Sequence, residues 1–280
     1  KVNSWDVQFL VQLQKNGVAS VGSASEGISI REYFPFEDTM WKIFQLFGKL
    51  FSFSVKERTD EIADKLWHKD VRFFSMYDKQ QGTLMGHFFI DSFPRPGKFQ
   101  RSACFPLQTH CVIDNFEQAQ VVCIVTNFRR SETTGESMLE HRELIAFLHE
   151  FGHCMHNMCT KSAFARFAGT NVEKDFAEFP SQLIQTWAWN KDGLRYLSSH
   201  YLKGNPLPDD VIDTILMSRS YGIGIETMSR IHLSKFDLYM HSSSNDTSNN
   251  NNNNNSNDSY SAQVYRSIKS EMSLIQVPEG

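Results

Sequence analysis

The sequence predicts a mainly α-helical fold with one small β-sheet, and three observations carry this prediction. Apolar residues recur at helical spacing between residues 36 and 67. From residue 84 to residue 128 the pattern changes to period-two alternation and short apolar runs, which are typical of strands. From residue 139 onward helical spacing returns. The length of 280 residues, of which 40% are hydrophobic, suits a globular protein with a sizeable core.

Residues 1–78 are predicted to form a mainly helical N-terminal part. Within them, Phe36–Phe53 and Lys56–Trp67 are the candidates for amphipathic helices, because their apolar residues recur at spacings of three and four. Each would place one apolar stripe against a common core.

Residues 79–130 are predicted to form the sheet. Gly86–Ile90, Arg101–Phe105 and Gln120–Val125 have strand character, and a turn rich in proline and glycine separates the first two. Pro106 cannot donate a hydrogen bond to a neighbouring strand, which suits either an edge strand or the end of a strand. An exposed edge can accept an extended peptide as an added strand. This sheet is therefore a candidate substrate edge.

The most informative motif is His149-Glu150-Phe151-Gly152-His153, an H-E-x-x-H sequence. On a helix the two histidines lie one turn apart on one face. Their nitrogens can then bind a single zinc ion at about 2.0–2.1 Å. Glu150 lies beside the metal position, where it can accept a proton from a zinc-bound water. The motif is typical of metallopeptidases, although an isolated match can also be a solvated helix that carries two histidines by chance.

The residues around the motif favour a zinc site within a helical core, residues 131–241. Leu144, Leu148, Phe151 and Met155 recur at spacings of four, three and four, the apolar stripe of a helix packed into a core. The two histidines lie beside this stripe. We therefore expect them to be partly buried and to need partners, which a metal ion supplies.

The third zinc ligand is open at this point. A catalytic zinc normally has three protein ligands and one open position. His156 follows His149 by about 10.5 Å along a straight helix, too far to share one ion. A metzincin would need glycine at position 156 and histidine at position 159, where this chain has His156 and Cys159. The remaining choice is a carboxylate on a second helix, and spacing does not select among three: Glu173, Asp175 and Glu178.

Three longer stretches carry a resemblance to a known family: HEFGHCMH at His149–His156, FAGTN at Phe167–Asn171, and DFAEFPSQ at Asp175–Gln182. They closely resemble the thimet oligopeptidase and neurolysin family of zinc peptidases, the M3 family. This family also includes dipeptidyl carboxypeptidases and mitochondrial intermediate peptidase. Shorter matches, such as Glu32–Pro35 and Phe93–Lys98, extend the resemblance over nearly the whole chain.

The resemblance implies a zincin-like catalytic core of the thimet oligopeptidase type. It implies that the glutamate two residues before Pro-Ser, Glu178, is the third ligand, so that His149, His153 and Glu178 bind one Zn²⁺ per chain. It also implies that Gly169 and Thr170 belong to a loop near the substrate. The implied function is that of a zinc metalloendopeptidase acting on short oligopeptides.

Other residues are expected to act around the zinc, one as the base and one as a partner of the histidines. Glu150 is the expected catalytic residue, which activates the zinc-bound water and later protonates the leaving amine. Zinc histidines usually donate their second ring N–H to an orienting group. Glu143 and Asp175 are the two candidates for that role, and the sequence does not rank them.

The family also carries, well downstream of the carboxylate ligand, a segment of the usual form Gly-Tyr-x-Ala-x-Tyr-Tyr-x-Tyr. Its tyrosines help to stabilise the oxyanion. The tyrosines of this chain, such as Tyr239, Tyr260 and Tyr265, form no such cluster before Gly280. We therefore expect a truncated, partial chain. The alternative to an active peptidase is a catalytically weak or inactive zinc- and peptide-binding fragment.

Composition adds no class of partner to the short peptides that the resemblance implies. A net charge of −4 without a basic stripe argues against nucleic acid, and the absence of an apolar run of 18 residues argues against a membrane span. Five cysteines without a CxxC pair predict free thiols in a reducing compartment. We expect a cytoplasmic location, with the mitochondrion as the alternative.

The last part of the chain contains a low-complexity insert. Residues 242–259 are dominated by asparagine and serine and have nothing apolar to bury, so we expect them to be disordered. Residues 260–280 are predicted to be a C-terminal helical remnant.

Overall fold

The computed structural model describes residues 6, 7, 9–11, 13, 28–114, 116–131, 135–242 and 259–272. The chain divides into two compact units, one of residues 27–212 and one of residues 1–26 together with 213–280. The segment predicted to be disordered, 242–259, lies outside the described residues except for its first and last positions.

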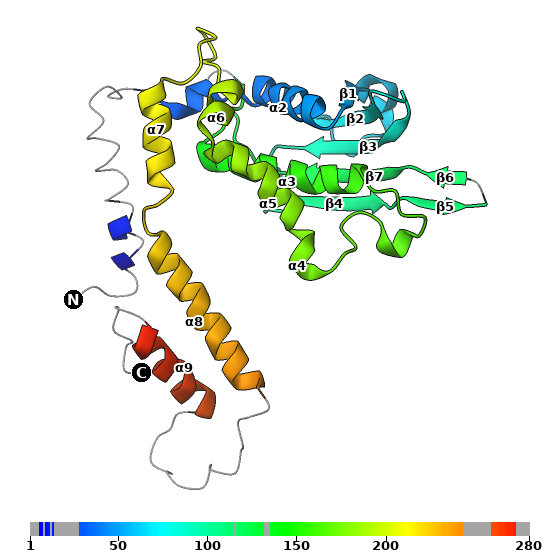
Figure 1. Ribbon diagram of the computed structural model, residues 1–280. Coiled ribbons are helices and arrows are strands. Elements are labelled where there is room, and N and C mark those ends of the chain that lie inside the picture. Colours follow the sequence, from blue (N-terminus) through cyan, green and yellow to red (C-terminus); the bar gives the residue numbers. More distant parts are fainter. Residues whose placement is uncertain are drawn as a thin grey trace. The chain divides into compact units, whose positions relative to one another are not determined.

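The unit of residues 27–212 is built on a five-stranded mixed sheet with the order β1-β2-β3-β7-β4 (Figure 1). Neighbouring strands are antiparallel except for β3 and β7, which are parallel. A separate two-stranded ribbon pairs β5 with β6. The strands are β1 Phe53–Glu57, β2 Val71–Asp78, β3 Leu84–Asp91, β4 Ala103–Gln108, β5 Cys111–Ile113, β6 Phe116–Gln118 and β7 Gln120–Val125.

The three predicted strands correspond to β3, β4 and β7. Strand β4 lies at one edge of the sheet, and its register with β7 shifts between Pro106 and Gln108. Pro106 therefore lies on an edge strand, where its missing N–H leaves no hydrogen bond unmade.

The prediction that residues 1–78 are mainly helical was wrong beyond residue 52. Strands β1 and β2 lie in this segment, and Lys56–Trp67 is not one amphipathic helix. Lys56 belongs to β1, while Thr59–Lys65 forms the 3₁₀ helix η2, which has non-helical dihedrals at Ile62 and buries no residue. An apolar stripe that finds no core to pack against does not stabilise a regular helix.

Two helices, α2 (Phe36–Leu50) and α3 (His141–Met158), pack on one face of the sheet. The ring of Phe44 on α2 lies 5.6 Å from Phe74 of β2 and 5.7 Å from Phe88 of β3. Phe44 also lies 5.4 Å from Phe151 of α3, so the two helices share one aromatic core. Helix α3 packs against β7 and β4, and Figure 1 shows it running along these strands.

Helix α3 is fixed at its start and along its buried side. Glu140 and Glu143 form a capping box at its N-terminus. The predicted apolar stripe is confirmed, because Leu144, Leu148 and Phe151 are fully buried and Met155 is almost so. The other helices between residues 27 and 218 are η1 Ile30–Tyr33, η3 Ala165–Phe167, α4 Lys174–Ala177, α5 Phe179–Gln185, η4 Thr186–Trp189, α6 Lys191–Leu197 and α7 Asp209–Ser218.

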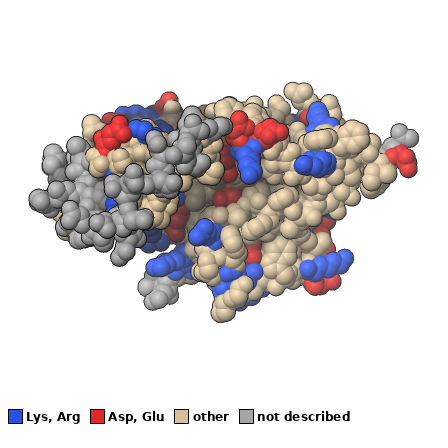
Figure 2. Space-filling model, turned by 90° about the horizontal axis from the view of Figure 1, so that it is seen from below, with Lys and Arg blue, Asp and Glu red and all other residues tan. Residues whose placement is uncertain are grey.

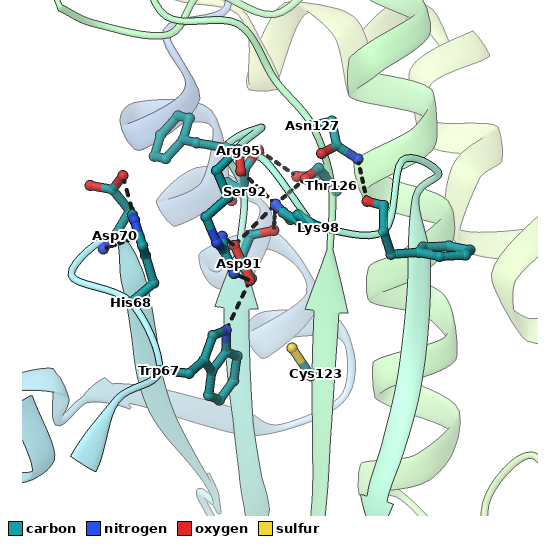
Figure 3. A network of polar contacts seen from close by, with 12 residues as sticks. Trp67, His68, Asp70, Asp91, Ser92, Arg95, Lys98, Cys123, Thr126 and Asn127 are labelled. Carbon is teal, nitrogen blue, oxygen red and sulfur yellow. Dashed lines mark hydrogen bonds and ion pairs between the residues drawn. The ribbon is translucent and has the colours of Figure 1, made fainter.

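A polar network around the buried Asp91 anchors the segment that leads from β3 into β4 (Figure 3). Arg95 makes a bidentate ion pair with Asp91, with both nitrogen–oxygen distances at 2.7 Å. The Lys98 ammonium lies 3.0 Å from the Asp91 carboxylate and donates to the carbonyl of Thr126 at 2.6 Å. Trp67 donates its indole N–H to the same carboxylate at 3.0 Å. The turn before the edge strand is therefore tied to the ends of β3 and β7.

The five cysteines are free thiols, which confirms that part of the prediction; the reducing compartment stays a prediction. Burial raises the pKa of Cys123 to about 12 and raises that of Cys154 well above its ordinary value. These thiols are therefore protonated at neutral pH.

The described residues beyond 212 contain the helices α8 (Ile223–His241) and α9 (Tyr260–Met272), which pack against each other. The ring of Tyr265 lies 4.6 Å from that of the buried His232.

No helix in the described part of the chain is both long and apolar enough to cross a bilayer. Figure 2 shows acidic and basic side chains interspersed on one face, with large uncharged areas between them.

Candidate metal centre

Helix α3 places the two histidines of the H-E-x-x-H motif side by side. His149 and His153 are four residues apart, and their ring centroids lie 4.9 Å apart at an interplanar angle of 84°. Both side chains are largely buried, with 26% and 14% of their surfaces exposed. The motif thus has the helical geometry that the sequence predicted.

Glu178 brings a carboxylate to both imidazoles from the junction between α4 and α5. Its Oε2 lies 3.2 Å from Nε2 of His149 and 3.2 Å from Nε2 of His153. The hydroxyl of the fully buried Ser181 donates to the same Oε2 at 3.1 Å and to the Glu178 carbonyl at 2.8 Å. This carboxylate is therefore held in place by the first turn of α5.

The other candidates for the third ligand point elsewhere. Glu173 is the N-cap residue of α4, and both it and Asp175 are exposed and make no contact with the two histidines among the described residues. The His156 ring packs 6.0 Å from Phe176. Of the carboxylates that spacing alone left open, Glu178 is therefore the one that the structure places beside the two histidines.

The spacing of the three donor atoms fits a zinc ion. Bonds of about 2.0–2.1 Å in a tetrahedral site place neighbouring ligand atoms about 3.3 Å apart. The separations of 3.2 Å between the Glu178 oxygen and each imidazole nitrogen agree with this value. Within the described ranges, His149, His153 and Glu178 are the one group of three such side chains whose donor atoms converge.

Gln185 orients one of the histidines, a contact that the sequence reasoning missed. Its Oε1 lies 2.9 Å from Nδ1 of His149. Because a carbonyl oxygen only accepts, Nδ1 carries the proton and Nε2 keeps its lone pair for a metal. Gln185 follows Glu178 by seven residues, two helical turns, and this spacing is the signal that could have indicated it.

The two residues predicted to orient the histidines do not do so in the structure. Glu143 accepts a hydrogen bond from the Glu140 N–H at 2.8 Å, so its carboxylate is engaged at the start of α3. It precedes His149 by almost two turns, too far for contact. Asp175 lies on an exposed turn of α4. This prediction was wrong for both residues.

Gly152 explains how α5 comes close enough to supply Glu178. A Cβ atom at Gly152 would lie 2.5 Å from the Cα of Ser181 and 3.2 Å from the Pro180 carbonyl oxygen. Any side chain here would push α5 away from α3. The second variable position of the motif is thus a contact point between the two ligand-bearing helices.

Gly169 and Thr170, predicted to lie near the substrate, follow the 3₁₀ helix η3. Gly169 is buried with φ +58°, and a Cβ there would lie 2.1 Å from Oδ1 of Asn157 on α3. Its conformation and this close approach give Gly169 a packing role. A role for Thr170, which is half-buried, in binding substrate stays a prediction.

Glu150 lies on α3, which packs against the edge strand β4. Its side chain is largely buried, and this burial raises its pKa, as does the negative charge of Glu178; the charge of His149 and the backbone N–H of Cys104 oppose the shift. The Cys104 N–H therefore faces Glu150 and points away from β7. The carboxylate is placed beside the metal position and next to an unpaired strand edge.

Comparison with known proteins agrees with the motifs. A model described as peptidase family M3 matches residues 1–279. The chain is similar to "Thimet-like oligopeptidase" of Dictyostelium discoideum, with 36% identity over 249 residues, covering 88% of this chain and 35% of that protein. It is 33% identical over 218 residues to "Saccharolysin" of Saccharomyces cerevisiae (strain ATCC 204508 / S288c), covering 76% and 31%.

A third relative is named for its compartment. "Mitochondrial intermediate peptidase, mitochondrial" of Arabidopsis thaliana is 26% identical over 239 residues, covering 85% of this chain and 33% of that protein. The chain thus spans about a third of the length of each of these three relatives.

Proposed function

The chain belongs to peptidase family M3, and from this premise we propose that it is the metal-binding part of a zinc-dependent metalloendopeptidase with a zincin-like core. The observation that carries the proposal is the convergence of His149, His153 and Glu178 on one point, with Glu150 beside them. His149, His153 and Glu178 would hold the zinc ion and leave a fourth position open.

The chemistry divides between the metal and the chain. Bound zinc would supply a Lewis acid that polarises the scissile carbonyl and makes water easier to deprotonate. Glu150 accepts the proton of the attacking water and passes it to the leaving amine. Its burial raises its pKa, which makes the carboxylate a stronger base.

The edge of β4 offers a place for the substrate backbone. Successive residues of a strand direct their backbone groups to alternate sides. Since the Cys104 N–H faces Glu150, the carbonyls of Cys104 and Pro106 point outward from the sheet. An extended peptide can pair with these acceptors and lie across the position of Glu150.

We propose short peptides as the substrates and a cytoplasmic location, with the mitochondrion as the alternative. The restriction to short peptides rests on relatives whose names call them oligopeptidases. The mitochondrial alternative rests on the name of the relative from Arabidopsis thaliana.

The proposal is tested by measuring hydrolysis of a quenched fluorescent peptide by the zinc-loaded chain, after removal of zinc by a chelator and after zinc is restored. Cleavage that depends on zinc supports the proposal. Cleavage that persists without metal contradicts it, as does a chain that binds no zinc.

A further inference from the structure

A cavity of about 510 Å³ lies next to the proposed site, between the start of β4 and the first turns of α3. Ala146 lines it, four residues before Glu150, which is about 6 Å along the helix axis. Ser102 also lines it, two residues before Cys104, about 7 Å along an extended chain. The cavity therefore begins about one helical turn before Glu150 on α3 and two residues before Cys104 on β4.

The lining of this cavity carries one positive charge in excess. Three arginines, Arg31, Arg129 and Arg142, face two carboxylates, Glu140 and Glu143. Glu140 lies 2.6 Å from the Arg142 guanidinium and 3.7 Å from that of Arg31. Both carboxylates are thus engaged by other groups of the chain, since Glu143 belongs to the capping box of α3.

Arg129 is the arginine of this lining whose charge is not paired with a carboxylate among the described residues. It lies on the segment after β7 and is exposed, and its guanidinium makes no hydrogen bond or ion pair among the described residues. A guanidinium presents N–H donors in a fork that matches a carboxylate in a bidentate manner. The cavity thus offers an anion-binding group that the fold itself does not require.

The direction of β4 determines which part of a peptide reaches this cavity. Antiparallel pairing is the more stable arrangement for an added strand. A peptide antiparallel to β4 runs, from its N-terminus to its C-terminus, from the Gln108 end toward the Ala103 end of the strand. Its C-terminal residues then extend past Ala103 toward Ser102 and Arg129.

We propose that Arg129 binds a carboxylate at the C-terminal end of the substrate, in the first place the terminal α-carboxylate. This inference rests on the proposed function and names a specificity element of the same site. It makes the distance from the scissile bond to the end of the peptide a determinant of binding. An aspartate side chain at the end of an amidated peptide offers the same chemistry.

The test is fluorescence anisotropy of the zinc-loaded 280-residue chain with peptides that carry fluorescein at the N-terminus. One peptide has a free C-terminal carboxylate, the second is its C-terminal amide, and the third is an amide whose last residue is aspartate. We expect the simple amide to bind about three- to tenfold more weakly than the free acid, as for loss of a charge-assisted contact at a solvent-accessible site. In Arg129→Gln the free acid and the amide should bind alike.

Arg101→Gln is the matched control, because Arg101 is an exposed arginine near the strand that does not line the cavity. This variant should keep the preference for the free acid. If it loses the preference to the same extent as Arg129→Gln, the effect is one of net charge and the inference is overturned. Equal binding of acid and amide by the unmodified chain also overturns it.

The third peptide distinguishes the two sources of the carboxylate. Recovery of tight binding with the aspartate amide, lost again in Arg129→Gln, supports a carboxylate site that also takes a side chain. No recovery, with the acid still preferred, restricts the site to the terminus. A chain that binds none of the peptides contradicts the proposed function and this inference together, whereas zinc-dependent cleavage without any preference contradicts this inference alone.

Discussion

Gly152 and Ser181 lie so close that a Cβ atom on the glycine would be 2.5 Å from the Cα of the serine. Gly152 lies between the two histidines of α3, and Ser181 holds the Glu178 carboxylate through its hydroxyl. This contact therefore sets the separation between the histidine pair and the third ligand. The motif fixes the geometry of the site through its glycine as well as through its donor atoms.

The first prediction concerns this contact. Gly152→Ala should destabilise the chain by about 1–3 kcal/mol, because α5 must move away from α3. It should also weaken zinc binding, because Glu178 moves with α5. Urea unfolding and zinc titration measure the two effects. Gly224→Ala is the control: a Cβ at this helical glycine meets nothing within 4 Å, so the change should be neutral or stabilising. Equal zinc affinity in both variants would contradict the account.

The second prediction concerns the orientation of His149. Gln185→Leu keeps much of the side-chain volume but removes the acceptor for the Nδ1 proton. Zinc affinity should fall roughly 10–100-fold, as is usual for loss of such a partner. Gln182→Leu, on an exposed position of the same helix, should leave the affinity unchanged. Competition with a fluorescent zinc chelator measures both constants, and similar affinities for the two variants would refute the role of Gln185.

The third prediction separates the base from the ligands. Glu150→Gln should retain zinc, because Glu150 is not among the three converging donors. Its rate of peptide hydrolysis should fall about 10²–10⁴-fold, the usual contribution of a general base. Zinc content and hydrolysis of a quenched fluorescent peptide are measured on the same sample. A variant that keeps both its zinc and its rate would exclude Glu150 as the base.

The fourth prediction concerns the network at Asp91. Burial alone would raise the pKa of this carboxyl, but the hydrogen bonds from Arg95, Trp67 and Lys98 outweigh it and hold the pKa at about 2, below the ordinary 3.8. The unfolded chain therefore binds this proton more tightly than the folded chain. The resulting stability is present above about pH 4 and is lost as the pH falls through 2.

Asp91→Asn should remove this part of the pH dependence. It should also cost about 3–5 kcal/mol at pH 7, because Lys98 is left buried without its carboxylate. Asp192→Asn, which removes an exposed partner of Arg195, should cost no more than about 1 kcal/mol. Urea unfolding between pH 2 and pH 7 gives the free energy of unfolding of both variants. If this free energy falls at acid pH in Asp91→Asn as it does in the unmodified chain, the pH dependence does not come from Asp91.

Local patterns carried most of what could be predicted of the fold. The stripe from Leu144 to Met155 and the H-E-x-x-H motif depend on neighbours within a few turns, so the helix α3 followed from spacing. Strands β1 and β2 were missed. Residues Val71–Asp78 place Phe73 and Phe74 on opposite faces of the sheet, and both faces carry aromatic contacts, so no period-two alternation is visible.

The rest of the site depends on contacts that spacing does not encode. Glu178 rather than Glu173 lies beside the histidines because α3 and α5 cross, which brings together residues 29 positions apart in the sequence, such as His149 and Glu178. Gln185 reaches His149 through the same crossing. The Asp91 network joins the ends of two strands. In the sequence alone, its residues look like those of an ordinary charged turn.

The central claim is that His149, His153 and Glu178 form one zinc site, and zinc content after dialysis against buffer without metal tests it most directly. We expect one zinc per unmodified chain, a large loss in Glu178→Gln, and full content in Glu173→Gln and Asp175→Asn, whose side chains do not reach the histidines. Full zinc content in Glu178→Gln, with the loss found instead in Glu173→Gln, would contradict it.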